Sequence, residues 1–238
     1  MKRISSLLVL GLAACSSSNN STVALGARAG TGASTAAAPL GQQAQALNTC
    51  DGFVITRLRM VLSEVKLESD QTTTADAGSS SGEIEFKSAP SLLDLPQSAL
   101  DSGTTTQVTV AEVPAGTYHE IKFKIHKISQ SEAGSDAGLQ AMAAQNASVI
   151  VDYTKNGAVP ASGPFVSSVD AQQKLEGTFP LTDGDHALTL NIDASTWFGT
   201  ATSCLDPAIA NNRSAIENNI QKSLKAYKDD DHDGHEDH

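Results

Sequence analysis

The densest group of possible metal ligands in this chain lies in its last ten residues, 229–238, with the sequence DDDHDGHEDH. Clustered carboxylates beside a glycine turn suit a hard cation such as Ca²⁺. Imidazoles suit softer ions such as Zn²⁺, Ni²⁺ or Cu²⁺. The pattern predicts divalent-metal binding by four acids and three histidines: Asp229, Asp231, Asp233, Asp237, His232, His235 and His238.

The order of these acids resembles the DxDxDG calcium loops of EF-hand and thrombospondin type-3 proteins. Asp229, Asp231, Asp233, Gly234 and Asp237 take positions 1, 3, 5, 6 and 9 of such a loop. The sequence stops before position 12, where a bidentate acid would complete the coordination. Calcium binding, zinc or nickel binding and a solvated acidic tail therefore all stay open.

Cys15 is the second residue with distinctive chemistry. It follows a positive start (Lys2, Arg3) and a short apolar run, which together are typical of a signal peptide over residues 1–14. The segment LAAC at 12–15 resembles the lipobox of bacterial lipoproteins. That resemblance implies diacylglycerol on the Cys15 thiol and an acyl chain such as palmitate on its amine. An ordinary secretory signal with a chance cysteine is the alternative.

Lipid on Cys15 would make the membrane a partner of the chain and place it in the cell envelope. Two or three acyl chains give stable anchoring, which a single chain does not. In enteric-type sorting an aspartate after the cysteine favours inner-membrane retention. Ser16 stands in that position here, which favours the outer membrane.

The remaining cysteines, Cys50 and Cys204, are an even pair in a chain expected to be exported. Oxidising compartments favour disulfides, so we predict a bridge between them. Two unpaired thiols are the alternative.

Signatures of common enzymes, such as GxSxG, HExxH, a Walker loop or CxxC, are missing from the sequence, so no catalytic residue is assigned and no enzyme is predicted. His119, His126 and His186 are expected on or beside strands rather than as catalytic bases. Trp197 is expected in the core rather than on a ligand platform. The net charge of −11 disfavours nucleic acid as a partner.

The elements that would position these residues are mostly strands. Alternating apolar residues predict a strand from Phe53, with a bulge or bend near Met60 and Val61, and a further strand at 148–153. Turn chemistry at 113–116 and 182–185 predicts two hairpins, at 107–126 and 175–192. Apolar residues at helical spacing predict one helix: Ile216, Ile220, Leu224 and Tyr227.

These elements predict a mainly β fold, an antiparallel β-sandwich with one C-terminal helix. Five segments are expected. They are a signal peptide (1–14), a lipidated Cys15 with a flexible linker (15–46), a β-sandwich domain (47–205), a helix (206–228) and an acidic tail (229–238).

The segments SLLDL at 91–95 and VPAGTY at 113–118, with the alternating strand after them, resemble a family of secreted bacterial and archaeal lipoproteins. Its members carry a domain of unknown function with a "DLL" segment followed by "PAGxY". The resemblance implies a transthyretin-like or immunoglobulin-like sandwich over about residues 50–195, and it carries no catalytic residues.

The leading hypothesis is therefore a lipid-anchored, non-catalytic binding or structural module of the cell envelope, with a protein or envelope partner still unknown. A divalent-metal-binding envelope protein that uses the tail is the alternative from another class. A hydrolase with an unrecognised site is the third, and a deep polar cleft with convergent histidine and carboxylates would favour it.

Overall fold

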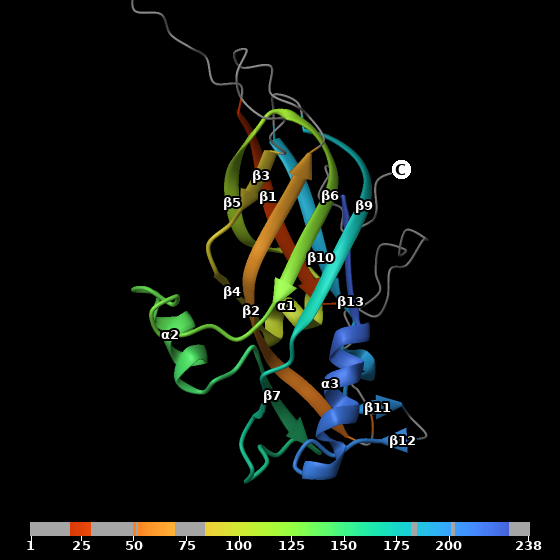
Figure 1. Cartoon of the computed structure of the whole chain (residues 1–238). Helices are drawn as coiled ribbons and strands as arrows, with labels where there is room; N and C mark the ends of the chain where they lie inside the picture. The colour runs from red at the N-terminus through yellow and green to blue at the C-terminus, as the bar shows by residue number, and fades with distance from the viewer. Residues whose placement is uncertain are drawn as a thin grey trace, which may run out of the picture.

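A computed structural model describes residues 20–29, 50, 52–69, 84–181, 185–200 and 203–228. These residues build two β-sheets packed together, with a helix near the C-terminal end (Figure 1). The mainly β class and the C-terminal helix predicted from the sequence are confirmed.

The larger sheet is antiparallel and is organised around one long strand, β2 (Phe53–Ser69). The strands are connected in the order β8-β7-β2-β6-β9, in which β7 pairs with the first half of β2 and β6 with its second half, along the same edge. β4 and β3 pair with the other edge of β2. The bounds of its other strands are Ile84–Lys87 (β3), Ser91–Pro96 (β4), Gly116–Ile125 (β6), Val149–Lys155 (β7), Phe165–Ser167 (β8) and Ala171–Leu181 (β9).

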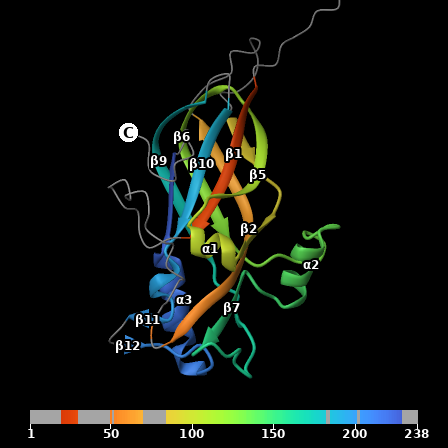
Figure 2. The same cartoon turned by 180° about the vertical axis from the view of Figure 1, so that it is seen from behind.

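The smaller sheet is mixed rather than antiparallel, with the order β13-β10-β1-β5. Its strands are Leu224–Lys228 (β13), Asp185–Ile192 (β10), Asn20–Ala29 (β1) and Thr106–Pro114 (β5). β1 runs parallel to β10, whereas its other neighbour, β5, is antiparallel. The purely antiparallel prediction is therefore wrong for this one pair. Figure 2 shows β1 and β10 side by side from behind.

β2 keeps its apolar residues on the core by means of two bulges, at Thr56 and Ser63. Each is an extra residue where the register with β7 or with β6 shifts by one. Because side chains alternate along a strand, one extra residue moves the core-facing side chains from odd-numbered to even-numbered positions, or back. The buried series is Phe53 and Ile55, then Leu58, Met60 and Leu62, then Val65 and Leu67.

The apolar run Met60-Val61-Leu62 has a second cause, which is burial of both faces of β2. Helix α2 (Ala137–Ala144) covers a smaller cluster with Val61 and Ile150 on the side away from the other sheet. Asp136 caps α2 by accepting from the Leu139 amide at 2.8 Å. The predicted irregularity in β2 is confirmed, but it consists of two bulges, at Thr56 and Ser63, which flank Met60 and Val61.

The segment 206–228, expected to be one helix, is a helix followed by a strand. A 3-10 turn, η2 (Ala210–Asn212), leads into α3 (Arg213–Lys222), and β13 begins at Leu224. Ile216 and Ile220 are the buried face of α3, whereas Leu224 and Tyr227 are buried from a strand. Helical spacing across the junction was therefore coincidental. A further short helix is α1 (Gln97–Ser102).

Both predicted hairpins are connections between the two sheets. β5 pairs with β1 in the smaller sheet, whereas β6, after the turn at 114–116, pairs with β2 and β9 in the larger one. β9 and β10 are divided between the sheets in the same way. Alternation identifies the buried face of a strand but not its partner, so the sequence pattern fits both arrangements.

The flexible linker predicted over 15–46 is wrong for residues 20–29, which form β1 in the interior of the smaller sheet. Its buried side chains, at every second position, are Val23, Leu25, Ala27 and Ala29. Small Ala and Gly residues suit this place, because Gly26 lies against Thr105, whose methyl group would lie 2.4 Å from an added Cβ.

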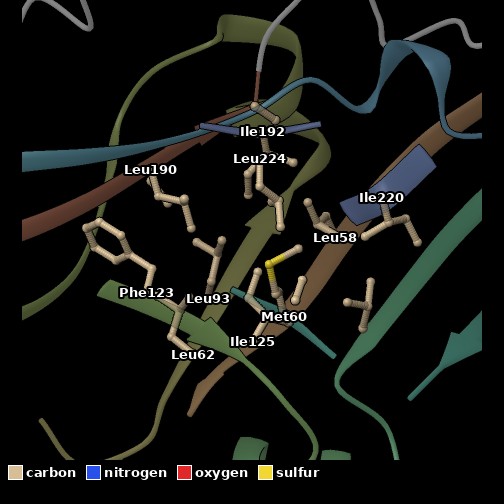
Figure 3. Packing of buried hydrophobic residues seen from close by; sticks show 14 of the residues in the cluster. Leu58, Met60, Leu62, Leu93, Phe123, Ile125, Leu190, Ile192, Ile220 and Leu224 are labelled. Atoms are coloured by element: carbon tan, nitrogen blue, oxygen red, sulfur yellow. The ribbon is translucent and has the colours of Figure 1, made fainter. Parts of the chain in front are cut away.

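One core lies between the two sheets (Figure 3). Leu190, Ile192 and Leu224 from the smaller sheet face Met60, Leu62 and Ile125 from the larger one, and Ile220 of α3 closes one end. The face predicted for Ile121, Phe123 and Ile125 is confirmed, because all three are buried.

Truncating Leu25 tests whether β1 is a structural strand. Leu25→Ala removes a buried side chain and should lower the free energy of unfolding by about 2–5 kcal/mol, measured by denaturant titration. Thr22→Ala, on the opposite face of the same strand, should cost less than about 1 kcal/mol. Equal and negligible effects would instead support a flexible linker.

Candidate functional site

A polar groove with a volume of about 300 Å³ lies where the smaller sheet meets α3. In Figure 1, α3 runs directly into β13 at this place. Four elements meet here: the end of β10, the 3-10 turn η1 (Ala194–Thr196), the last turn of α3 and the start of β13. The groove is lined by Asn191, Asp193, Thr196, Asn219, Lys222, Ser223 and Lys225.

Trp197 holds one lining residue of this groove, Ser223, in place. Its side chain is fully buried, which confirms the predicted core position, and its indole Nε1 donates to Ser223 Oγ at 2.7 Å. Ser223 Oγ in turn donates to the Ile220 carbonyl at 2.7 Å. A buried indole N–H needs a partner, so the core itself holds Ser223 at the groove.

Hydrogen bonds also hold the walls of the groove. Asn219 donates from its side-chain amide to the carbonyls of Thr196 at 3.1 Å and Trp197 at 3.3 Å, which ties α3 to η1. Asp193 Oδ1 accepts from the Ser195 amide at 3.1 Å and the Ser195 hydroxyl at 2.5 Å. The Asp193 amide donates to the Ser223 carbonyl at 3.0 Å. The groove is thus preformed rather than assembled from loose loops.

Two lysines give the groove its positive character. Lys222 ends α3, and Lys225 lies opposite Asn191 in the β10–β13 ladder. Ile192 and Leu224 point into the core, so their neighbours Asn191 and Lys225 lie on the outer face of the sheet. The arrangement can bind a small polar molecule. The deep cleft of histidine and carboxylate that would favour a hydrolase does not occur among these residues.

A second charged cluster, the outer-face network, covers the larger sheet on the side away from the core. Lys122 of β6 forms ion pairs with Glu68 of β2 at 2.5 Å and with Glu120. Lys66 pairs with Glu68 at 2.6 Å, and Lys174 of β9 pairs with Glu120 at 2.9 Å. These ion pairs link β2, β6 and β9. Because each glutamate is paired with lysines, the cluster favours a structural role.

The network shifts the protonation of its members. Hydrogen bonds from Lys122 and then Lys66 lower the pKa of Glu68 to about 2. Hydrogen bonds from Lys122 and then Lys174 lower the pKa of Glu120, while its carboxylate and that of Glu68 raise the pKa of Lys122. Glu68 and Glu120 are directly opposed across the two strands, so Lys122 also screens a like-charge pair.

Cys50 and Cys204 form the predicted disulfide, with their Cα atoms 5.7 Å apart. The bond joins Cys50, three residues before the start of β2, to the small hairpin of β11 (Gly199–Thr200) and β12 (Ser203–Cys204). Gly199 has φ +103°, and an added Cβ would lie 2.0 Å from the Ser203 carbonyl oxygen, so this hairpin needs glycine. Phe53, Tyr153 and Phe198 pack beside the bridge with tilted or edge-to-face rings, whose centroids are 5.3–5.9 Å apart.

The other predicted site residues lie apart or outside the described residues. Cys15 and the tail residues 229–238 lie outside the described residues, so lipidation of Cys15 and metal binding by the tail stay predictions. His119 and His126 belong to or follow β6, and His186 lies on β10 in the other sheet. Within the described ranges, no group of three or more His, Cys, Asp or Glu side chains is arranged to hold a metal ion.

Comparisons with protein-family models, with curated proteins and with solved structures find no match to this chain. Over the described part of the chain, no helix has both the length and the apolar character needed to cross a bilayer.

Sequence reasoning missed the groove entirely. Its residues come from two stretches, 191–196 and 219–225, and neither contains a recognisable motif. The only local signal is that Asn191 is a polar residue between two apolar ones in β10, and this alternation is common to all strands with one solvent-facing side.

Removing the disulfide tests its contribution to stability. The chain-entropy model gives about 5 kcal/mol for a bridge that closes a loop of 154 residues. Replacing both Cys50 and Cys204 by serine should therefore lower the unfolding free energy by up to about 5 kcal/mol. Alkylation of both cysteines in the non-reduced native chain, read by peptide mass mapping, would show that the bridge does not form.

The outer-face network predicts an acid-sensitive contribution to stability. The folded pKa of Glu68 lies below its ordinary 4.5, so its stabilisation is present above about pH 5 and is lost as the pH falls toward 2. Lys122→Gln should lower Tm at pH 7 and flatten the fall in Tm over that acid window. Lys127→Gln, at an exposed position just after β6, is the charge-matched control. Parallel pH profiles for wild type and Lys122→Gln would contradict the assignment.

Proposed function

We propose that the chain is a lipid-anchored, non-catalytic binding module of the cell envelope. The observation that carries the proposal is the LAAC segment ending at Cys15, five residues before the first described strand, β1. The disulfide supports it weakly, because such bonds persist in oxidising compartments. The choice of the outer membrane rests on Ser16 alone.

The early start of β1 gives this proposal a geometry. Five residues of chain span at most about 18 Å, so lipid on Cys15 would hold the domain close to the membrane. The first residue of β1, Asn20, pairs with Pro114 at the end where β5 crosses to β6. Ala29, at the other end of β1, pairs with Ile192, next to the groove. The proposed anchor and the groove therefore lie at opposite ends of the smaller sheet.

A transthyretin-like or immunoglobulin-like sandwich is part of the same proposal. The packed sheets support it, as do the buried Leu93 and Leu95 within the "DLL" segment of β4. The parallel β1–β10 pair and the bulged central strand β2 depart from a simple antiparallel sandwich.

Acyl labelling tests the anchor directly. Cells that express the full chain, fed with labelled palmitate, should label the wild type and lose that label in Cys15→Ser. The variant should also keep its signal segment, read by intact mass. Cys50→Ser is the matched control, because it removes a different thiol and should remain labelled. Labelling of Cys15→Ser at the wild-type level would refute lipidation at this residue.

A further inference from the structure

We propose that the polar groove between β10, η1, α3 and β13 binds a small polar molecule through a carboxylate or phosphate group. This inference deepens the proposed binding role, on which it rests for its biological sense, but it does not depend on the lipid anchor. It follows from three features of the groove: an amide that faces it, two lysines without an ion pair among the described residues and a rigid frame.

Asn191 is the first feature. The residue is only 3 % exposed, and it lines the groove. Its side-chain amide is not among the enclosed polar atoms left without a partner, so it can be hydrated from the groove. A polar group of a ligand can replace that water and form the same hydrogen bond.

Lys222 and Lys225 are the second feature. Neither forms an ion pair in the part of the chain that the structure describes, whereas most lysines of the larger sheet do. The single carboxylate of the lining, Asp193, accepts two hydrogen bonds from the neutral groups of Ser195 and keeps its charge. The lining therefore has two lysines against one carboxylate, a positive balance in a protein whose net charge is −11.

This charge pattern selects the class of ligand. Two ammonium groups disfavour a metal ion and favour an oxyanion, with which each can form a charge-assisted hydrogen bond. The amides of Asn191 and Asn219 add neutral polar contacts, which suit hydroxyl groups on the rest of the ligand. The C-terminal end of α3 bears partial negative charge, which stabilises the lysines and keeps oxyanion affinity modest.

The size of the groove fits such a ligand. Its volume of about 300 Å³ is at the lower end of the range for small-molecule sites. That space suits one monosaccharide acid or a comparable phosphorylated compound. A rigid frame adds affinity, because Trp197, Ser223 and Asn219 are already held by core hydrogen bonds and lose little freedom on binding.

The chain supplies its own reporter for this site. Trp197 is the one tryptophan of the sequence, and its indole donates to Ser223 in the groove lining. A ligand that contacts Ser223 should change the emission of Trp197. The experiment titrates the full chain with inorganic phosphate, glucuronate and neutral glucose, followed by Trp197 fluorescence and by calorimetry.

The expected result is saturable binding of phosphate or glucuronate, weaker at high salt, with glucose at least about 10-fold weaker. Phosphate without glucuronate indicates a phosphate ligand, and glucuronate without phosphate indicates a sugar acid. The double variant Lys222→Gln, Lys225→Gln should weaken binding at least about 10-fold, because the loss of a single charge-assisted hydrogen bond is enough to reduce affinity by that factor. Lys127→Gln should bind as the wild type does.

Three results would overturn the proposal. They are no saturable heat with either anion up to about 10 mM, equal binding of glucose, or unchanged affinity in the double variant with an unchanged Tm. Because the lysines are exposed at the rim of the fold, a folded double variant is expected, and its Tm shows whether that holds. None of these results bears on acyl labelling at Cys15, so the two proposals fail separately.

Discussion

The fold depends on β2 keeping one apolar face toward the core over seventeen residues while it pairs with four other strands. β7 and then β6 occupy one side of it, and β4 and then β3 occupy the other. A long strand twists, and a regular one would turn its side chains away from a flat partner sheet. The bulges at Thr56 and Ser63 reset the alternation, so both halves of β2 contribute to the same core.

The faces of the large apolar strands could be predicted from the sequence, but their partners could not. Ile121, Phe123 and Ile125 alternate with charged residues, and that pattern has one physical solution, a strand with one buried face. Whether β6 pairs with β5 or with β9 depends on which layer each strand joins, a choice made by long-range packing. The turn at 114–116 is short enough for a hairpin, and it instead links the layers.

β1 could not be predicted because its residues give a weak strand signal. Alanine and glycine make up four of the ten residues of NSTVALGARA, and both are depleted in strands in general. They are accommodated here because β10 and β5 enclose β1 on both sides, and Gly26 fits the close approach of Thr105. Tertiary enclosure supplies what local propensity lacks. The disulfide, in contrast, followed from the number of cysteines and the expectation of export, and neither depends on local structure.

The groove follows from the need to bury Trp197. A buried indole needs an acceptor for its N–H, and Ser223 supplies one from the junction of α3 and β13. That contact draws the end of α3 against η1, where Asn219 bonds to two carbonyls, and it leaves Lys222 and Lys225 at the rim. The core thereby shapes the groove and fixes its polar lining, so any change that loosens Trp197 should alter both the stability of the fold and the shape of the groove.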